Sequence, residues 1–188
     1  LRCLVGSEMC IRDRVVDELY EAFTGDSVLP SADFTATPNL LVFRSLAKTA
    51  GLAGLRIGFA IGHADVVDRV SRVTGPYDVN SVAVAAAFAA LADQSYVDAY
   101  VAEVLRARDW TLQALRDAGV RHHCDGGNYL LIWPQRPVDA VDASLREAGI
   151  LVRSMAGKPL IDGCFRVSVG TTSQTVSYTH LTLPTNGC

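Results

Sequence analysis

The stretch NLLVFRSLAKTAGLAGLRIGFAIG, residues 39–62, decides the fold of the first part of the chain. It contains two short apolar runs, residues 39–44 and 55–61, joined by a loop of small residues. Apolar runs of this length between small residues are typical of buried strands. The stretch therefore predicts two strands, and the loop between them carries Lys48.

The hydrophobic pattern on either side of this stretch predicts further elements of an α/β unit. Apolar residues at helical spacing and an alanine-rich run indicate helices downstream of the second strand. The predicted elements are the end of a strand at 15–17, a helix around 66–73 stopped by Gly75-Pro76, a helix that Ser81 caps and that runs to about residue 91, and a long helix over 96–118 with Val97, Val101, Val104, Leu105, Leu112 and Leu115 facing inward.

The texture of the sequence changes after the long helix. The run YLLIW at residues 129–133 predicts a strand, and Val138, Val141 and Leu145 mark a helix that ends at Gly149. Two further strands are expected at residues 150–153 and 165–169. The expected fold class is thus an α/β unit followed by a smaller α+β unit, joined by the long helix.

Composition excludes several classes of protein. The 188 residues carry 17 basic and 20 acidic side chains, a net charge of −3, so bulk charge does not favour binding to nucleic acid or to an anionic membrane. The longest apolar run is shorter than the roughly 20 residues that span a membrane. Five cysteines without paired spacing predict neither a disulfide framework nor a zinc site, and Cys124 and Cys164 suit a reducing cytosol. In His122-His123-Cys124 adjacent side chains point apart, which favours a structural role over a metal site.

Both ends of the chain depart from this pattern. The opening LRCLVGSEMCIRDR has no hydrophobic period, and its reverse translation resembles a transposase-tagging adapter used in short-read sequencing. The closing VSYTHLTLPT reverse-translates into the same adapter end in the opposite orientation. We therefore expect residues 1–14 and 176–188 to be foreign sequence and the functional residues to lie within residues 15–175.

Lys48 and Arg56 are the first candidates for chemistry. A lysine in a loop of small residues can be approached closely by a ligand, and partial desolvation would free its amine as a nucleophile. Arg56, beside glycines that expose backbone N–H groups, suits an anionic group such as a phosphate. The alternatives are a solvated surface lysine and an arginine in an ordinary salt bridge.

Three other residues add to this pattern. Asp17 ends an apolar strand, where ligands gather in open α/β sheets, and Tyr20 can donate a hydrogen bond from its phenol. Asp17 could instead cap a helix. In FRVSVG, Phe165 and Val167 alternate toward the core, so Arg166 points the other way and could hold a carboxylate with two hydrogen bonds, unless it is an ordinary edge residue.

An amine nucleophile, an acid for a ring nitrogen, a phenol and a phosphate-binding arginine are the groups that pyridoxal phosphate requires. The chain resembles the fold-type I pyridoxal-phosphate (PLP)-dependent aminotransferases of class I/II, most closely their histidinol-phosphate branch. The segments that carry the resemblance are VVDELYEAF, residues 39–62, RVTGPYDVNSVAVAAAFAAL, GNYLLI and GILVRSM…LIDGCFRVSVGT. They span essentially all of residues 15–175.

This resemblance implies a role for each candidate residue. Lys48 would carry the cofactor covalently and move the proton between the substrate Cα and the cofactor C4′. The remaining expected roles are Asp17 on the pyridinium nitrogen, Tyr20 on the ring O3′, Ser45 and Arg56 on the cofactor phosphate, Arg166 on the substrate α-carboxylate and Arg153 on the substrate's phosphate.

The resemblance also implies the activity and organisation of the parent protein. The expected reaction exchanges an amino group between histidinol phosphate and 2-oxoglutarate, in histidine biosynthesis, by a cytoplasmic homodimer. Residues 15–92 would be the C-terminal part of the large PLP-binding domain, and residues 93–175 the interdomain helix and the small domain. The N-terminal half would be missing, so we expect the fragment alone to be inactive or weakly folded.

Two positions depart from the family pattern, and other functions remain open. Ala47 stands where the family usually has a serine, which removes one phosphate contact, and Asp78 stands where asparagine is usual. An aromatic-amino-acid aminotransferase or a threonine-phosphate decarboxylase would share the same cofactor residues. A non-catalytic relative that serves as a scaffold is the alternative of a different class.

Overall fold

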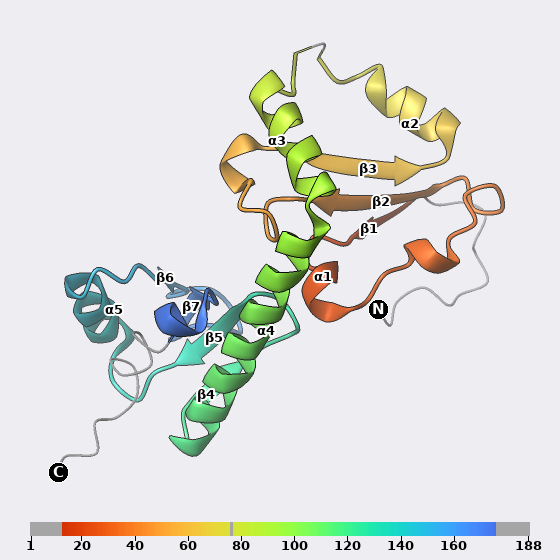
Figure 1. Ribbon diagram of the computed structural model, residues 1–188. Coiled ribbons are helices and arrows are strands. Elements are labelled where there is room, and N and C mark those ends of the chain that lie inside the picture. Colours follow the sequence, from red (N-terminus) through yellow and green to blue (C-terminus); the bar gives the residue numbers. More distant parts are fainter. Residues whose placement is uncertain (1–12, 76, 176–188) are drawn as a thin grey trace. The chain divides into compact units, whose positions relative to one another are not determined.

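The computed structural model describes residues 13–75 and 77–175 (Figure 1). Most of the two segments predicted to be foreign, residues 1–14 and 176–188, lies outside the described residues, as does Pro76. The chain folds as two compact units that divide between Gln94 and Ser95.

The first unit is built on a three-stranded sheet. Its strands β1 (Arg14–Asp17), β2 (Leu40–Ser45) and β3 (Gly58–Gly62) lie in the order β1-β2-β3 (Figure 1). β1 runs parallel to β2, and β3 runs antiparallel to it. The central strand supplies the buried Val42, as expected for an apolar run between two neighbours. The predicted strands at 15–17 and 39–44 are confirmed.

The third strand begins later than the apolar pattern predicts. Residues Ala53–Leu55 form a short 3-10 helix, η2, and Arg56 has a left-handed backbone with φ of 57°. A strand cannot pass through that conformation, so β3 starts only at Gly58. The left-handed region costs a non-glycine residue about 1–2 kcal/mol, which the surrounding structure must supply.

Two short and two longer helical segments complete the described part of this unit. They are α1 (Glu21–Thr24), the 3-10 turn η1 (Leu29–Ser31), α2 (Ala64–Ser71) and α3 (Ser81–Ala92). The residue that caps α3 is Asn80 and not Ser81, because Oδ1 of Asn80 accepts the Ala83 N–H at 2.8 Å. Asn80 also donates to the Leu55 carbonyl at 3.3 Å, which ties the start of α3 to η2.

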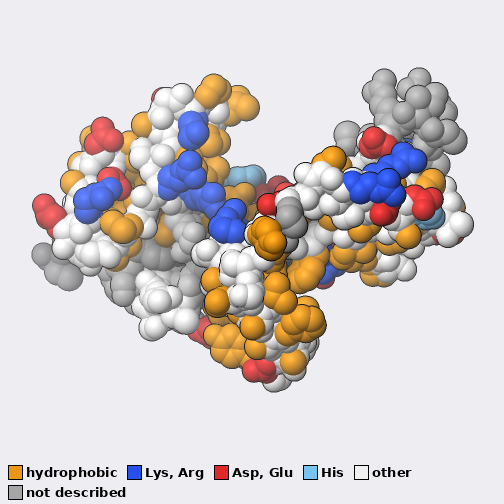
Figure 2. All heavy atoms as spheres, turned by 90° about the horizontal axis from the view of Figure 1, so that it is seen from above, with side chains coloured by type: hydrophobic (Ala, Val, Ile, Leu, Met, Phe, Trp, Pro, Cys, Tyr) orange, Lys and Arg blue, Asp and Glu red, His pale blue; other side chains and the backbone are white. Residues whose placement is uncertain are grey.

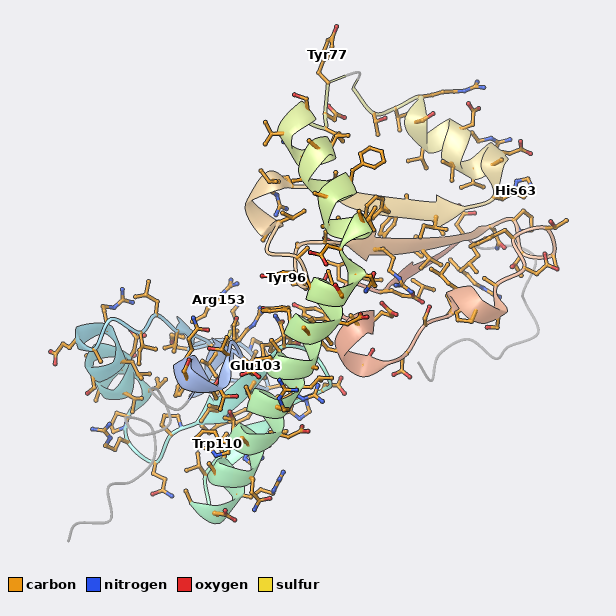
Figure 3. All side chains as sticks on the ribbon, in the orientation of Figure 1. His63, Tyr77, Tyr96, Glu103, Trp110 and Arg153 are labelled. Atoms are coloured by element: carbon orange, nitrogen blue, oxygen red, sulfur yellow. The ribbon has the colours of Figure 1, made fainter. Side chains whose placement is uncertain are left out.

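The helix α3 is apolar on all sides. Ala83 and Ala87 are buried, whereas Val82, Phe88 and Leu91 are exposed. Figure 2 shows that hydrophobic side chains gather in patches on the face it displays. Tyr77, just before this helix, extends away from the ribbon in Figure 3. Among the described residues, no helix has the length and apolar character to cross a membrane.

The second unit pairs helices with a four-stranded antiparallel sheet. Its helices are α4 (Gln94–Asp117), which starts at the last residue of the first unit, and α5 (Val138–Glu147). The strands lie in the order β4-β5-β7-β6, and they are β4 (Arg121–His123), β5 (Tyr129–Trp133), β6 (Arg153–Ser154) and β7 (Phe165–Ser168).

The core of this unit follows the predicted periodicities. On β7 and just beyond it, Phe165, Val167 and Val169 are buried, while Arg166 between them is partly exposed. On α4 the fully buried positions include Ala107 and Thr111. Three of the residues predicted to face inward on α4, Val101, Leu105 and Leu112, are only half-buried. Ala107 and Thr111 occupy the centre of the inner face instead.

Two smaller differences have local causes. The strand predicted at residues 150–153 is reduced to β6, since the Ile150 N–H bonds back to the Leu145 carbonyl at 2.8 Å and belongs to the end of α5. β4, which the sequence did not predict as a strand, contains His122, whose Nδ1 lies 2.8 Å from the Val120 carbonyl oxygen.

Candidate functional site

The carboxyl ends of two parallel strands bring the first candidate residues together. Parallel pairing places the ends of β1 and β2 at one edge of the sheet, with Asp17 opposite Phe43. The chain reaches Tyr20 after β1 and Lys48 after β2. Nζ of Lys48 lies 5.5 Å from the centroid of the Tyr20 ring. An amine and a phenol that are distant in sequence thus meet at this edge.

A cavity of about 520 Å³ opens beside this amine. Ser45, Lys48 and Arg56 line it, together with Phe43 and Phe59. The cavity therefore combines a hydroxyl, an amine and a guanidinium with aromatic walls. The three polar residues predicted from the stretch 39–62 share one hollow, although Arg56 belongs to a turn and not to a strand.

Hydrogen bonds fix the polar residues of this cavity. The Ser45 hydroxyl donates to the Ile57 carbonyl at 3.4 Å and accepts the Ala47 N–H at 3.1 Å. One terminal nitrogen of Arg56 donates to the Ala53 carbonyl at 3.0 Å. The loop that carries Lys48 and the turn that carries Arg56 are thereby both tied to Ser45 at the end of β2.

Asp17 does not cap a helix. Its Oδ1 accepts the Leu19 N–H at 3.0 Å, which forms a local turn, and the N-cap position of α1 belongs to Tyr20. The helix-cap alternative for Asp17 is therefore wrong. Its carboxylate is exposed at the strand end and has no second hydrogen-bond partner among the residues that the structure describes.

The residues of this edge fit pyridoxal phosphate. The group carries a dianionic phosphate, an aldehyde and a ring nitrogen that is protonated when an acid faces it. The cavity offers a guanidinium and a hydroxyl for the anion and an amine for the aldehyde, and Asp17 offers a carboxylate. The donor set is thus matched in kind to each polar part of the cofactor.

A partly buried ion pair next to these residues in the sequence was not predicted. The carboxylate of Glu18 accepts from Arg44 Nε at 2.8 Å, from the Val28 N–H at 2.6 Å and from the Ser27 hydroxyl at 3.0 Å. Arg44 also binds Glu21 at 2.6 Å. The network ties the segment after β1 to β2. In the sequence, Glu18 lies between Asp17 and Tyr20, and Arg44 directly precedes Ser45. An arginine inside the apolar run NLLVFR was the signal that could have revealed it.

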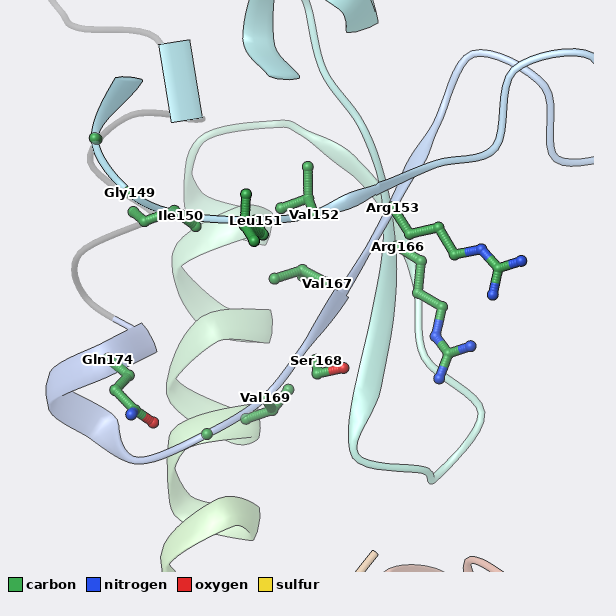
Figure 4. A pocket seen from close by; sticks show the side chains of 12 residues that line it. Gly149, Ile150, Leu151, Val152, Arg153, Arg166, Val167, Ser168, Val169 and Gln174 are labelled. Atoms are coloured by element: carbon green, nitrogen blue, oxygen red, sulfur yellow. The ribbon is translucent and has the colours of Figure 1, made fainter. Parts of the chain in front are cut away.

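The two arginines predicted to bind substrate lie in the second unit. Arg153 of β6 is paired directly with Arg166 of β7, and both line a cavity of about 850 Å³. Figure 4 shows the two side chains extending to the same side, away from Val167 and Val169. The guanidinium carbon of Arg166 lies 4.2 Å from the centroid of the Tyr129 ring.

A contact between α4 and the turn after β7 supports one wall of this cavity. Oε1 of Glu103, labelled in Figure 3, accepts both the N–H and the hydroxyl of Thr172, at 2.9 and 2.8 Å. The Thr172 N–H is the main reason that the pKa of Glu103 falls from 4.5 to about 2. Gly170 and Gln174, on either side of Thr172, belong to the cavity wall.

Two cysteines are free in the described part of the chain, and neither lines these cavities. Burial raises the pKa of the Cys164 thiol. Its Sγ lies 3.0 Å from the Ile161 carbonyl. These features indicate a structural residue and not a nucleophile.

The chain is similar to known proteins over most of its length. The family model described as aminotransferase class I and II matches residues 14–180. Histidinol-phosphate aminotransferase 1 of Pseudomonas fluorescens (strain Pf0-1) is 34% identical over 164 residues, which cover 85% of this chain and 46% of that protein. The chain spans about half the length of the curated relatives it matches.

Solved structures share the fold. The histidinol-phosphate aminotransferase from Sinorhizobium meliloti, in complex with pyridoxal-5'-phosphate, has a TM-score of 0.73 at 24% identity and covers 88% of this chain and 46% of its own. The L-threonine-O-3-phosphate decarboxylase from Porphyromonas gingivalis has a TM-score of 0.74 at 24% identity and covers 89% and 53%. The expected fold class, the α/β and α+β units of a fold-type I PLP enzyme, is confirmed. The chain belongs to the aminotransferase class I and II family.

Proposed function

We propose that this chain is the C-terminal part of a PLP-dependent aminotransferase that exchanges an amino group between histidinol phosphate and 2-oxoglutarate. One observation carries the proposal: the Lys48 amine lies over the Tyr20 ring, beside a cavity that Ser45 and Arg56 also line. The name of the Pseudomonas fluorescens relative supports histidinol phosphate as the substrate. The PLP complex of the Sinorhizobium meliloti structure supports the cofactor.

The residues of the first unit hold the cofactor and handle one proton. When bound, pyridoxal phosphate supplies an electron-poor ring that stabilises negative charge at the substrate α-carbon. Arg56 and Ser45 bind its phosphate, Tyr20 donates a hydrogen bond to its ring hydroxyl oxygen, and Asp17 holds the proton on its ring nitrogen. Nζ of Lys48 would take the proton from the substrate Cα and deliver it to the cofactor C4′.

The residues of the second unit bind the anionic ends of the substrates. Arg166 lies on a strand and lines the cavity, where its guanidinium can donate two hydrogen bonds to a carboxylate. Arg153, opposite it, binds the phosphate of histidinol phosphate. The parent enzyme acts in histidine biosynthesis as a cytoplasmic homodimer, and the names of the relatives support the pathway.

The test of the cofactor site uses the two lysines of the sequence, Lys48 and Lys158. The 188-residue chain is incubated with pyridoxal phosphate and reduced with borohydride, and the modified peptide is identified by mass spectrometry. We expect the label on Lys48, its loss in Lys48→Arg and its retention in Lys158→Arg. Equal labelling of the two lysines would overturn the proposed site.

The test of the substrate uses the complete gene product that contains this chain. Transamination is measured with histidinol phosphate and with phenylalanine, and decarboxylation with phosphothreonine. We expect the highest kcat/KM with histidinol phosphate. A preference for phenylalanine or phosphothreonine would reassign the substrate, and no turnover together with no label on Lys48 would favour a non-catalytic scaffold.

A further inference from the structure

The pairing of Arg153 with Arg166 is unfavourable without an anion. The two residues are direct partners in the antiparallel pair β6 and β7, so both side chains leave the same face of the sheet. Like charges directly opposite one another destabilise a sheet. Among the described residues, neither arginine forms an ion pair with a carboxylate. Both line the same cavity, so a bound anion would relieve the repulsion.

Among the rings that the structure describes, a stack is found for only one of the two arginines. Tyr129 of β5 pairs with Ser168 of β7, which makes it a diagonal neighbour of Arg166 on the same face. The guanidinium carbon of Arg166 lies 4.2 Å from the centroid of the Tyr129 ring. Arg166 lines the cavity, but Tyr129 is not among its described lining residues. The stack with Arg166 therefore links Tyr129 to a ligand in the cavity.

We propose that Tyr129 is a positioning residue that holds the Arg166 guanidinium over its ring and presents the N–H edge of that group to an anion in the cavity. A guanidinium stacked on a ring face keeps its N–H groups free in its own plane, where they match the two oxygens of a carboxylate or a phosphate. The long side chain loses less rotational freedom on binding, because much of that freedom is already lost in the stack. The inference rests on the anion-binding role proposed for Arg166.

The same sheet contains a matched control. Arg121 of β4 lies over the ring of Trp133 on β5, with the guanidinium carbon 4.2 Å from the ring centroid. Trp133 and Tyr129 are on the same strand and face, but Arg121 is not among the described residues that line the cavity. Trp133→Leu removes an equivalent stack elsewhere in the sheet, together with the hydrogen bond from the indole N–H to the Asp162 carbonyl, so it controls for a general loss of stability.

The proposal is tested in the 188-residue chain by nuclear magnetic resonance of arginine Nε–Hε groups, with inorganic phosphate as the probe. We expect phosphate to shift the Arg166 signal. We expect Tyr129→Leu to weaken phosphate binding by about fivefold, which corresponds to about 1 kcal/mol of cation–π interaction. Tyr129→Phe, which keeps the ring, and Trp133→Leu should bind as the unaltered chain does. Equal binding by Tyr129→Leu, or equal weakening in Trp133→Leu, would overturn the proposal.

A second measurement needs no variant, so it still decides if Tyr129→Leu fails to fold. In the unaltered chain without phosphate, the Nε order parameter of Arg166 should match that of Arg121. It should exceed that of Arg153, which is exposed and has no stack with a ring in the described part of the chain. An Arg166 as mobile as Arg153 would contradict the inference. Neither measurement involves Lys48 or pyridoxal phosphate, so its result is distinguishable from that of the labelling test.

Discussion

Replacing Glu18 with alanine should destabilise the first unit far more than replacing Glu21, although both carboxylates bind the same arginine. The Glu18 side chain is 2% exposed and lies 2.8 Å from Arg44 Nε, whereas Glu21 is 28% exposed and lies 2.6 Å from Arg44 NH1. The two contacts have similar lengths but differ in burial. Their comparison therefore isolates the effect of removing a carboxylate from water.

The size of the effect follows from the partners that each carboxylate leaves behind. Breaking a buried ion pair costs about 3–5 kcal/mol when the remaining charge is uncompensated. Arg44 is 27% exposed and keeps Glu21, but the Val28 N–H loses its acceptor, which costs about 1–3 kcal/mol. We therefore expect Glu18→Ala to cost about 3 kcal/mol, and Glu21→Ala about 0.2–1 kcal/mol as a partly exposed pair.

The assay must report on the first unit by itself. Both tryptophans, Trp110 and Trp133, lie in the second unit, so their fluorescence serves as an internal control. Native-state hydrogen exchange of peptides from residues 14–45, followed by mass spectrometry, gives the opening free energy of the first unit. Equal losses in Glu18→Ala and Glu21→Ala would refute the reasoning, because burial would then not determine the strength of the contact.

Two further predictions concern the cap of α3 and the contact of Glu103. Asn80→Ala should lower the free energy of unfolding by about 1 kcal/mol, since Asn80 is the residue that caps the helix. Ser81→Ala should lower it by less than about 0.5 kcal/mol. Equal losses in urea denaturation would contradict this assignment. Because its pKa lies at about 2 instead of 4.5, the Glu103 carboxylate stabilises the fold above pH 4.5, and this contribution is lost as the pH falls toward 2. The stability difference between the unaltered chain and Glu103→Gln, from urea unfolding followed by tryptophan fluorescence, should therefore shrink over that range, and a constant difference would show that the carboxylate is not linked in this way.

The hydrophobic pattern predicted correctly those strands whose limits coincide with an apolar run of the sequence. The run YLLIW coincides with β5, because a short apolar run bounded by Asn128 and Pro134 is typical of a buried strand. The start of β3 could not be predicted in this way. Leu55 and Ile57 are apolar, but the left-handed backbone of Arg56 between them depends on a turn that closes against β2. Apolar character indicates burial and does not specify backbone conformation.

The candidate site was predicted as a set of residue types, and its geometry required the fold. Lys48 and Tyr20 meet because β1 and β2 are parallel neighbours, which the sequence allowed but did not impose. The partnership of Glu18 with Arg44 joins residues on different strands, so no periodicity reveals it. The stacking of Arg166 on Tyr129 depends on the register of β5 and β7, and a shift of one residue would place the ring on the opposite face.

The Glu18–Arg44 pair could stabilise the unit only through the attraction between its two charges, or Glu18 could also anchor the neighbouring segment of the chain. Replacing a buried ion pair with apolar residues of similar size is often neutral or stabilising by about 1–4 kcal/mol. That result is not expected here, because Glu18 also accepts from the Val28 N–H and the Ser27 hydroxyl. The double variant Glu18→Leu/Arg44→Leu would leave both donors without this carboxylate, and it should remain less stable than the unaltered chain by about 1–3 kcal/mol. Full recovery of stability would show that the two residues matter only through their mutual attraction. A persistent loss would support a role of Glu18 in anchoring the segment between Tyr20 and Val28 to the strand that leads to Lys48.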